Sequence, residues 1–177
     1  MARYIGIAVV AAAVALAGCH KSMTPAAETT QGYCYSNGIG VPKNYATAFY
    51  LFKKAADQGY ARAEIDLGSA YAMGRGVPKN YKEAVYWFRK AAEKRFVGLG
   101  YAEAKLGMLY YLGDGVSEDY VRAYKWFALA KAAIQPGEKG STRISHLLRL
   151  VASRMSPSQI AHAQSLASKW ERAHESQ

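Results

Sequence analysis

Three segments of this chain share one pattern of residues, and this internal repetition constrains the fold more than any other feature. Two glycines and a valine are followed by a tyrosine, an alanine and a phenylalanine. The pattern begins at Gly38, Gly74 and Gly113, so the copies lie 36 and 39 residues apart. Such a period is typical of helical hairpins that stack, because one hairpin cannot bury its apolar face alone. The sequence therefore predicts an all-α solenoid of three helix-turn-helix repeats.

The middle copy shows how each repeat is expected to fold. Apolar residues at helical spacing predict a first helix, called helix A, over Tyr60 to Met73. Gly74 is expected to end it in a left-handed conformation, which glycine adopts without a side-chain penalty. Asn80 is expected to cap the second helix, called helix B, and Glu83 to complete a capping box. The residues expected to be buried are Ala63, Leu67, Ala70 and Tyr71 of helix A and Tyr81, Ala84, Val85, Phe88, Ala91 and Ala92 of helix B.

The same pattern predicts the boundaries of the repeat region. Residues 27–36 keep the small residues of helix A but have Gln31 where the next copy has Leu67. A terminal repeat that faces solvent is polar at such a position, so this segment is expected to be an N-terminal capping helix. The expected repeats cover residues 27–59, 60–95 and 101–134.

Residues 135–177 lack the repeat and are expected to form capping helices that cover the last hairpin. Ser141 or Thr142 would cap the first of them. The second has a favourable start, with Ser156 as N-cap, Pro157 at the first helical position and Gln159 as the partner of the cap.

The two inner copies, LGSAYAMGRGVPKNYKEAVYWFRKAAEK and LGMLYYLGDGVSEDYVRAYKWFALAKAA, resemble repeats of the Sel1-like family, a relative of the tetratricopeptide repeats. They match it in the Leu-Gly pair, the tyrosines, both turn glycines, the valine, the alanine and the tryptophan. The resemblance covers about residues 27–134. It implies a right-handed α-solenoid, with a C-terminal helical cap, that binds other proteins.

The N-terminus has the features of a bacterial lipoprotein signal. Arg3 precedes an apolar run of about fifteen residues, which is too short for a comfortable membrane span. The run ends in Leu-Ala-Gly-Cys, which resembles a lipobox and implies lipidation of Cys19. Residues 1–18 would then be the signal peptide and 19–26 a tether, and His20 after the cysteine resembles outer-membrane cargo. The remaining alternative is an ordinary cleaved signal with an incidental cysteine.

The charge of the chain favours anionic surfaces. The formal net charge is +10, and removal of residues 1–18 takes away only Arg3 and leaves 22 basic against 13 acidic residues. Lipid headgroups and acidic envelope polymers are therefore expected partners. Nucleic acid is disfavoured, because the basic residues are spread along the chain and the export signal points elsewhere.

No catalytic, metal or cofactor site is predicted. The glycine-lysine turns lack the spacing of a phosphate-binding loop, and the four histidines include no pair at ligand spacing. The acidic residues are expected mostly on outward helix positions or in caps. Cys34 aligns with apolar residues of the other repeats and is expected to be buried, with a reactive thiol as the alternative.

The best candidate binding surface is the face of the A helices outside the buried stripe. Its mixture of methionine, aromatic and charged residues suits a groove for an extended peptide or a partner helix. A solvated face whose apolar members pack locally is the alternative. The candidate residues are Arg62, Asp66, Ser69, Met73, Lys105, Met108, Tyr111 and Leu112, beside Tyr33, Asn37 and Tyr101.

Two functions of different class follow. The favoured one is a non-enzymatic adaptor, anchored to the membrane at the periplasmic face of the outer membrane, that holds a protein or peptide partner. The alternative is an enzyme acting on cell-wall or β-lactam substrates, which the cysteine-rich secreted relatives of the repeat family imply. Those relatives carry a cysteine pair in each repeat, whereas the repeats here hold only Cys34.

Overall fold

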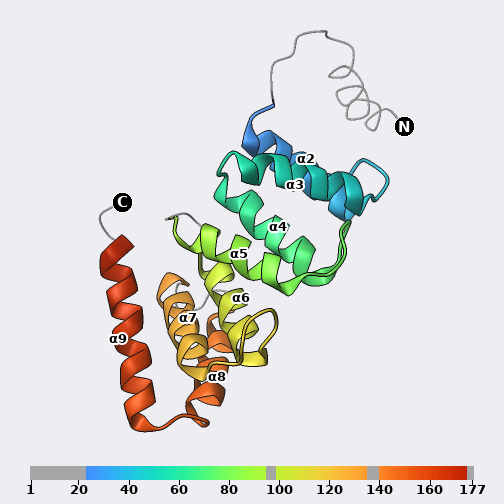
Figure 1. Ribbon diagram of the computed structural model, residues 1–177. Helices are drawn as coiled ribbons and strands as arrows, with labels where there is room; N and C mark the ends of the chain where they lie inside the picture. The colour runs from blue at the N-terminus through green and yellow to red at the C-terminus, as the bar shows by residue number, and fades with distance from the viewer. Residues whose placement is uncertain (1–22, 95–98, 135–139, 175–177) are drawn as a thin grey trace.

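A computed structural model describes residues 23–94, 99–134 and 140–174, and within these ranges the chain forms helices and no strand (Figure 1). The all-α class predicted from the sequence is therefore confirmed. The helices are α2 (Pro25–Asn37), α3 (Tyr45–Asp57), α4 (Ala61–Met73), α5 (Tyr81–Ala92), α6 (Leu99–Leu112), α7 (Tyr120–Ala133), α8 (Ser141–Ala152) and α9 (Pro157–His174).

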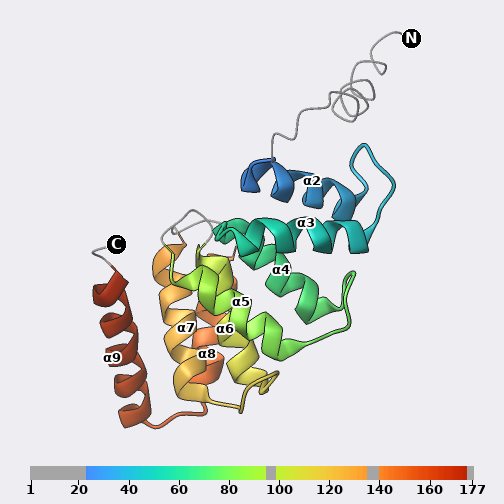
Figure 2. The same cartoon turned by 45° about the horizontal axis from the view of Figure 1, so that its top comes forward.

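Consecutive helices pair into three stacked hairpins. Within each repeat helix A packs on helix B, as α2 on α3, α4 on α5 and α6 on α7, and each hairpin packs on the next. Both capping helices pack on α7, so α2 and α9 lie at opposite ends of the stack (Figures 1 and 2). This arrangement confirms the predicted solenoid with a C-terminal helical cap.

In the second and third repeats, the second glycine of the turn is the point where the hairpin touches the preceding one. Gly76 and Gly115 both have positive φ, 76° and 73°. A side chain at Gly76 would overlap the carbonyl oxygen of Tyr45, and one at Gly115 would lie 2.5 Å from the carbonyl carbon of Tyr81. The spacing of the repeats is therefore set by backbone contact at a position where only glycine fits.

Helix A and helix B of one hairpin approach closely because helix A carries a glycine. A Cβ atom at Gly68 would lie 3.1 Å from the ring of Phe88, and one at Gly107 would lie 2.7 Å from the ring of Phe127. Trp87 packs in the other direction, against residues of the first repeat such as Phe52. The tryptophan of helix B in the second repeat therefore fills the space between the first two repeats.

The predicted helix caps are partly confirmed. Asn80 accepts hydrogen bonds from the backbone N–H groups of Lys82 and Glu83, at 3.1 and 3.2 Å. The prediction of a reciprocal capping box is wrong, because the N–H of Asn80 donates to the carbonyl of Tyr71 instead.

The starts of the two capping helices differ from each other. Neither Ser141 nor Thr142 caps α8, because Gly140 occupies the N-cap position and makes no side-chain hydrogen bond. At α9 the reciprocal pair forms as predicted. The N–H of Gln159 donates to Ser156 Oγ at 3.3 Å, and the N–H of Ser156 donates to Gln159 Oε1 at 2.8 Å.

Three glutamates contradict the expectation that acidic residues lie on the outside. Glu28, Glu64 and Glu103 occupy equivalent positions in the three A helices and are at most 3% exposed. In the first repeat a lysine of helix B pairs with the carboxylate, and in the second the partner is a lysine just after helix B. Lys54 lies 2.6 Å from Glu28, and Lys94 lies 2.6 Å from Glu64. Burial of these charges is tolerated because each carboxylate has a partner.

Glu103, the glutamate of the third repeat, has no lysine at the equivalent positions. The positions equivalent to Lys90 and Lys94 of the second repeat hold Leu129 and Ala133 in the third. Oε2 of Glu103 is buried and has no hydrogen-bond partner among the described residues. Burial, and secondly the charge of Glu171, raises the pKa of Glu103 to about 8.

Candidate functional site

The predicted binding residues of the second repeat lie together in space. Asp66, Ser69 and Met73 of α4 line a cavity of about 180 Å³ between the first and second hairpins. The side chain of Met73 is well exposed, whereas Asp66 and Ser69 are half-buried. The remaining walls come from α2, α3, the turn after α4, and α6, with the residues Tyr33, Ser36, Asn37, Tyr45, Ala48, Phe49, Phe52, Ala70, Arg75 and Tyr101.

A second, shallower cavity of about 240 Å³ continues this surface toward the start of α2. Arg62 and Asp66 line it and form an ion pair, with Nε 3.4 Å from the carboxylate oxygen. Burial raises the pKa of Asp66, and the charge of Arg62 opposes that shift. Asp66 and Tyr33 border both cavities, so the two form one continuous surface across the first two repeats.

Of the predicted residues of the third repeat, Tyr101 lines the first cavity, whereas Lys105, Met108, Tyr111 and Leu112 line neither. Lys105 places its ammonium group 5.0 Å from the ring centre of Tyr101. Met108 and Tyr111 are half-buried and pack against the core, and Leu112 is largely exposed. The structure thus brings Tyr101 together with the candidates of the second repeat, and the other four candidates of the third repeat do not line these cavities.

The two cysteines differ in what the structure describes. Cys19, the predicted lipidation site, lies outside the described residues, as do the signal segment 1–18 and residues 20–22 of the tether. Cys34 is a free cysteine and half-buried, so the prediction that it is fully buried is wrong. Within the described ranges, each helix is either too short or too polar to cross a bilayer.

A third cavity lies elsewhere, and it was not predicted from the sequence. It has a volume of about 710 Å³ and lies between α5, α7 and α9. Because α9 packs on α7 outside the repeat pattern, periodicity gave no sign of it. The available signal was the basic and aromatic composition of α7 together with Trp170. The lining residues are Arg89, Glu93, Tyr110, Asp119, Val121, Arg122, Lys125, Trp126, His162, Leu166 and Trp170.

Two arginines of this cavity flank one tyrosine ring. The guanidinium carbons of Arg89 and Arg122 each lie 5.6 Å from the ring centre of Tyr110, and Arg89 also donates a hydrogen bond to the tyrosine hydroxyl. Arg122 lies 3.4 Å from the carboxylate of Asp119. Arg89 makes no ion pair with any described residue. Its guanidinium group contacts the ring and the hydroxyl of Tyr110.

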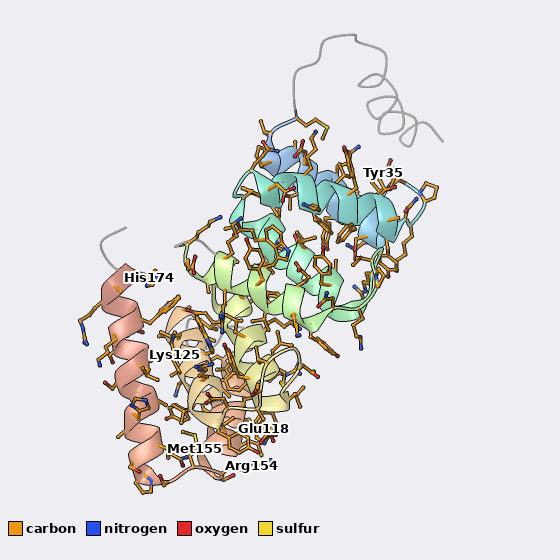
Figure 3. The ribbon with its side chains drawn as sticks, in the orientation of Figure 1. Tyr35, Glu118, Lys125, Arg154, Met155 and His174 are labelled. Carbon is orange, nitrogen blue, oxygen red and sulfur yellow. The ribbon has the colours of Figure 1, made fainter. Side chains whose placement is uncertain are left out.

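Lys125 of α7 lies on the side facing α9 (Figure 3), and its ammonium group contacts two indole rings. Its ammonium nitrogen is 4.2 Å from the ring centre of Trp126 and 4.1 Å from that of Trp170. His174 stacks on Trp170 with ring centres 4.2 Å apart. Partial burial, and secondly the charge of Arg89, lowers the pKa of Lys125 to about 8. The two aromatic rings stabilise its positive charge. No described carboxylate lies within ion-pair distance of it.

Among the described residues, no three His, Cys, Asp or Glu side chains are grouped as metal ligands would be. The described residues form two candidate binding surfaces, a mixed groove on the A helices and a basic, aromatic cavity between α5, α7 and α9.

Comparisons with solved structures identify the fold. The chain resembles c5321, a protective antigen present in uropathogenic Escherichia coli strains that displays an SLR fold. The two are 30% identical with a TM-score of 0.73, over 85% of this chain and 30% of that one. A Sel1 repeat protein from Oxalobacter formigenes is 38% identical with a TM-score of 0.62, over 72% of this chain and 47% of that one. The chain thus spans less than half the length of both.

The family model agrees with these neighbours, although no curated protein matches the chain significantly. The Sel1 repeat model matches residues 32–60, 61–96 and 100–133, which is more than half of the chain and follows the three hairpins. Proteins with such repeats are generally protein–protein interaction modules, and the fold is typically a non-enzymatic scaffold. This chain belongs to the Sel1 repeat family.

Proposed function

We propose that this protein is a lipid-anchored adaptor of the bacterial cell envelope that holds a protein partner on its A helices. The observation that carries the proposal is the continuous surface across the first two repeats, formed by two adjoining cavities that share Asp66 and Tyr33. It combines an exposed methionine, tyrosine rings and an ion pair. Such a surface suits an extended peptide, because flexible apolar contacts and a few polar groups can both be used.

The lipid anchor is inferred from the sequence of the N-terminus. A lipid on Cys19 would leave five residues before Pro25, the first residue of α2. Six peptide steps span at most roughly 20 Å, so the repeats would lie close to the bilayer surface. Several acyl chains would make this attachment nearly permanent. The +9 charge of the chain without residues 1–18 would favour the anionic surroundings of an envelope. The partner would thereby be concentrated near the membrane.

A photocrosslinking experiment tests the binding surface. A photoreactive residue replacing Met73, which is 43% exposed and lines the first cavity, should capture a defined partner in cells. The same residue replacing Tyr50, which is 65% exposed on α3, is the matched control. Equal capture from both positions would exclude a specific groove on the A helices.

The anchor is tested independently. Labelled palmitate should be incorporated into the wild-type protein, and Cys19→Ala should abolish the label and release the protein from membranes. A wild-type protein that takes up no palmitate would refute the lipoprotein assignment, while leaving the crosslinking result unaffected.

A further inference from the structure

The cavity between α5, α7 and α9 is distinct from the surface of the A helices. It is formed on one side by helix B of the second and third repeats and on the other by α9, which no repeat contains. Its volume of about 710 Å³ falls in the range of pockets that bury a small ligand or a few residues of a peptide.

Positive charge dominates this cavity. Arg89, Arg122 and Lys125 line it against the carboxylates of Glu93 and Asp119. Asp119 is already engaged, because it caps α7 through the N–H of Arg122 at 2.8 Å and lies 3.4 Å from the guanidinium of that residue. Neither Arg89 nor Lys125 forms an ion pair with a described residue. Two cations are therefore available to one incoming anion, and arginine favours carboxylate through paired hydrogen bonds.

The aromatic residues of the cavity are not free to stack on a flat ligand. The ring of Trp170 is already engaged, because the ammonium group of Lys125 lies over it at 4.1 Å and the imidazole of His174 stacks on it at 4.2 Å. Trp126 carries Lys125 over its ring and meets Trp170 edge to face. Nucleobase binding relies on an open aromatic face, so the arrangement disfavours nucleic acid. The indole edges and Leu166 instead give apolar walls beside the cations.

We propose that this cavity is a second binding site, which takes an acidic segment of a peptide with an apolar residue beside its carboxylate. The carboxylate lies between Arg89 and Lys125, and the apolar side chain packs against Trp126 and Leu166. Binding replaces the missing counter-charge of Lys125, which its neighbours Arg89 and Arg122 otherwise repel. The site does not depend on the surface of the A helices, so either could fail without the other.

The three tryptophans provide the assay. The intact protein, labelled with ¹⁵N-tryptophan in neutral detergent micelles, is titrated with the peptide Ac-Gly-Glu-Leu-Glu-Gly-NH₂, and its three indole signals are followed. The signals of Trp126 and Trp170 should shift to saturation. The signal of Trp87, which is buried between the first two repeats, should stay fixed. The isosteric peptide with glutamine in place of glutamate should cause no saturable shift.

Variants test which cations bind. Arg89→Gln and Lys125→Gln should each weaken binding at least about tenfold, because each removes a charge-assisted hydrogen bond to the carboxylate. Lys125→Arg keeps the charge and should retain binding. The matched control is Lys131→Gln, which removes an exposed cation from the last turn of α7 and should have no effect.

Four outcomes would overturn the proposal. They are no shift at millimolar peptide, an equal shift with the glutamine peptide, an equal shift with inorganic phosphate at the same concentration, and an equal loss in Lys131→Gln. The third would show a simple anion site, and the fourth a general effect of net charge.

Discussion

The buried glutamate of the third repeat gives a sharp prediction about stability and pH. Glu103 is 3% exposed and its pKa is raised from 4.5 to about 8. Between these values the folded state binds a proton that the unfolded state releases. The contribution of Glu103 to folding stability is therefore fully present below pH 4.5 and is lost as pH rises through 8. At about 1.4 kcal/mol per pKa unit, the loss has a ceiling of about 5 kcal/mol.

Glu103→Gln should remove this pH dependence. The amide has the shape of the protonated carboxyl group and no proton to lose. The variant should be within about 1 kcal/mol of the wild type at pH 4.5 and more stable than it by a few kcal/mol at pH 8.5. Urea unfolding followed by circular dichroism at several pH values measures both differences. The comparison isolates Glu103 because every other titrating group is common to both proteins.

Glu64→Gln is the matched control at the equivalent position. It leaves Lys94, whose ammonium lies 2.6 Å from the carboxylate, without its buried partner. Loss of stability by about 1–3 kcal/mol is expected at neutral pH, less than for a fully buried pair because Lys94 is 34% exposed. If Glu103→Gln were destabilised at pH 8.5 as strongly as Glu64→Gln, or if its advantage did not grow with pH, the argument would fail.

Further predictions concern the hairpin contacts, the thiol and the cap. Gly76→Ala should cost about 3 kcal/mol or more in thermal unfolding, because the new methyl group overlaps Tyr45, whereas Gly40→Ala should cost only about 1 kcal/mol, since Gly40 has a positive φ but open space around it. Equal losses of stability in Gly76→Ala and Gly40→Ala would refute the role of the contact between Gly76 and Tyr45. Cys34 should react with iodoacetamide in the folded protein, more slowly than after denaturation, and complete protection would contradict its half-buried position. Ser156→Ala should destabilise α9 by about 1 kcal/mol, measured by hydrogen exchange, and unchanged protection would mean that the cap contributes nothing.

The repeat frame could be predicted because it depends on local, periodic signals. Gly74 and Gly76 fix a helix end and a turn, and Asn80 caps helix B, as their spacing indicates. The half-formed capping box shows the limit of such rules. The N–H of Asn80 is already used by the carbonyl of Tyr71, so Glu83 has no donor to reach back to.

The candidate site was predicted only in part, because a helix face does not specify which residues meet across repeats. Asp66 and Met73 border cavities since α2 and α6 approach them from both sides. Met108 and Tyr111 occur at comparable positions but pack on the core of the third hairpin. The buried glutamates did leave a periodic signal, a glutamate in each helix A followed 26 residues later by a lysine in the first two repeats.

The end of that periodic signal explains why Glu103 is buried without an ion-pair partner among the described residues. Where the second repeat has Lys90, the third has Leu129, which is 3% exposed and belongs to the same buried cluster as Val151 of α8 and Ala167 of α9. An apolar residue at this position suits a hairpin whose outer side is covered by capping helices, because a lysine there would lose its water. The exchange leaves Glu103 without a cation. The positive charge of Lys125 lowers the pKa of Glu103, but the effect of burial is larger. The capping helices thus stabilise the end of the solenoid with apolar contacts and leave a buried carboxyl group whose pKa is raised.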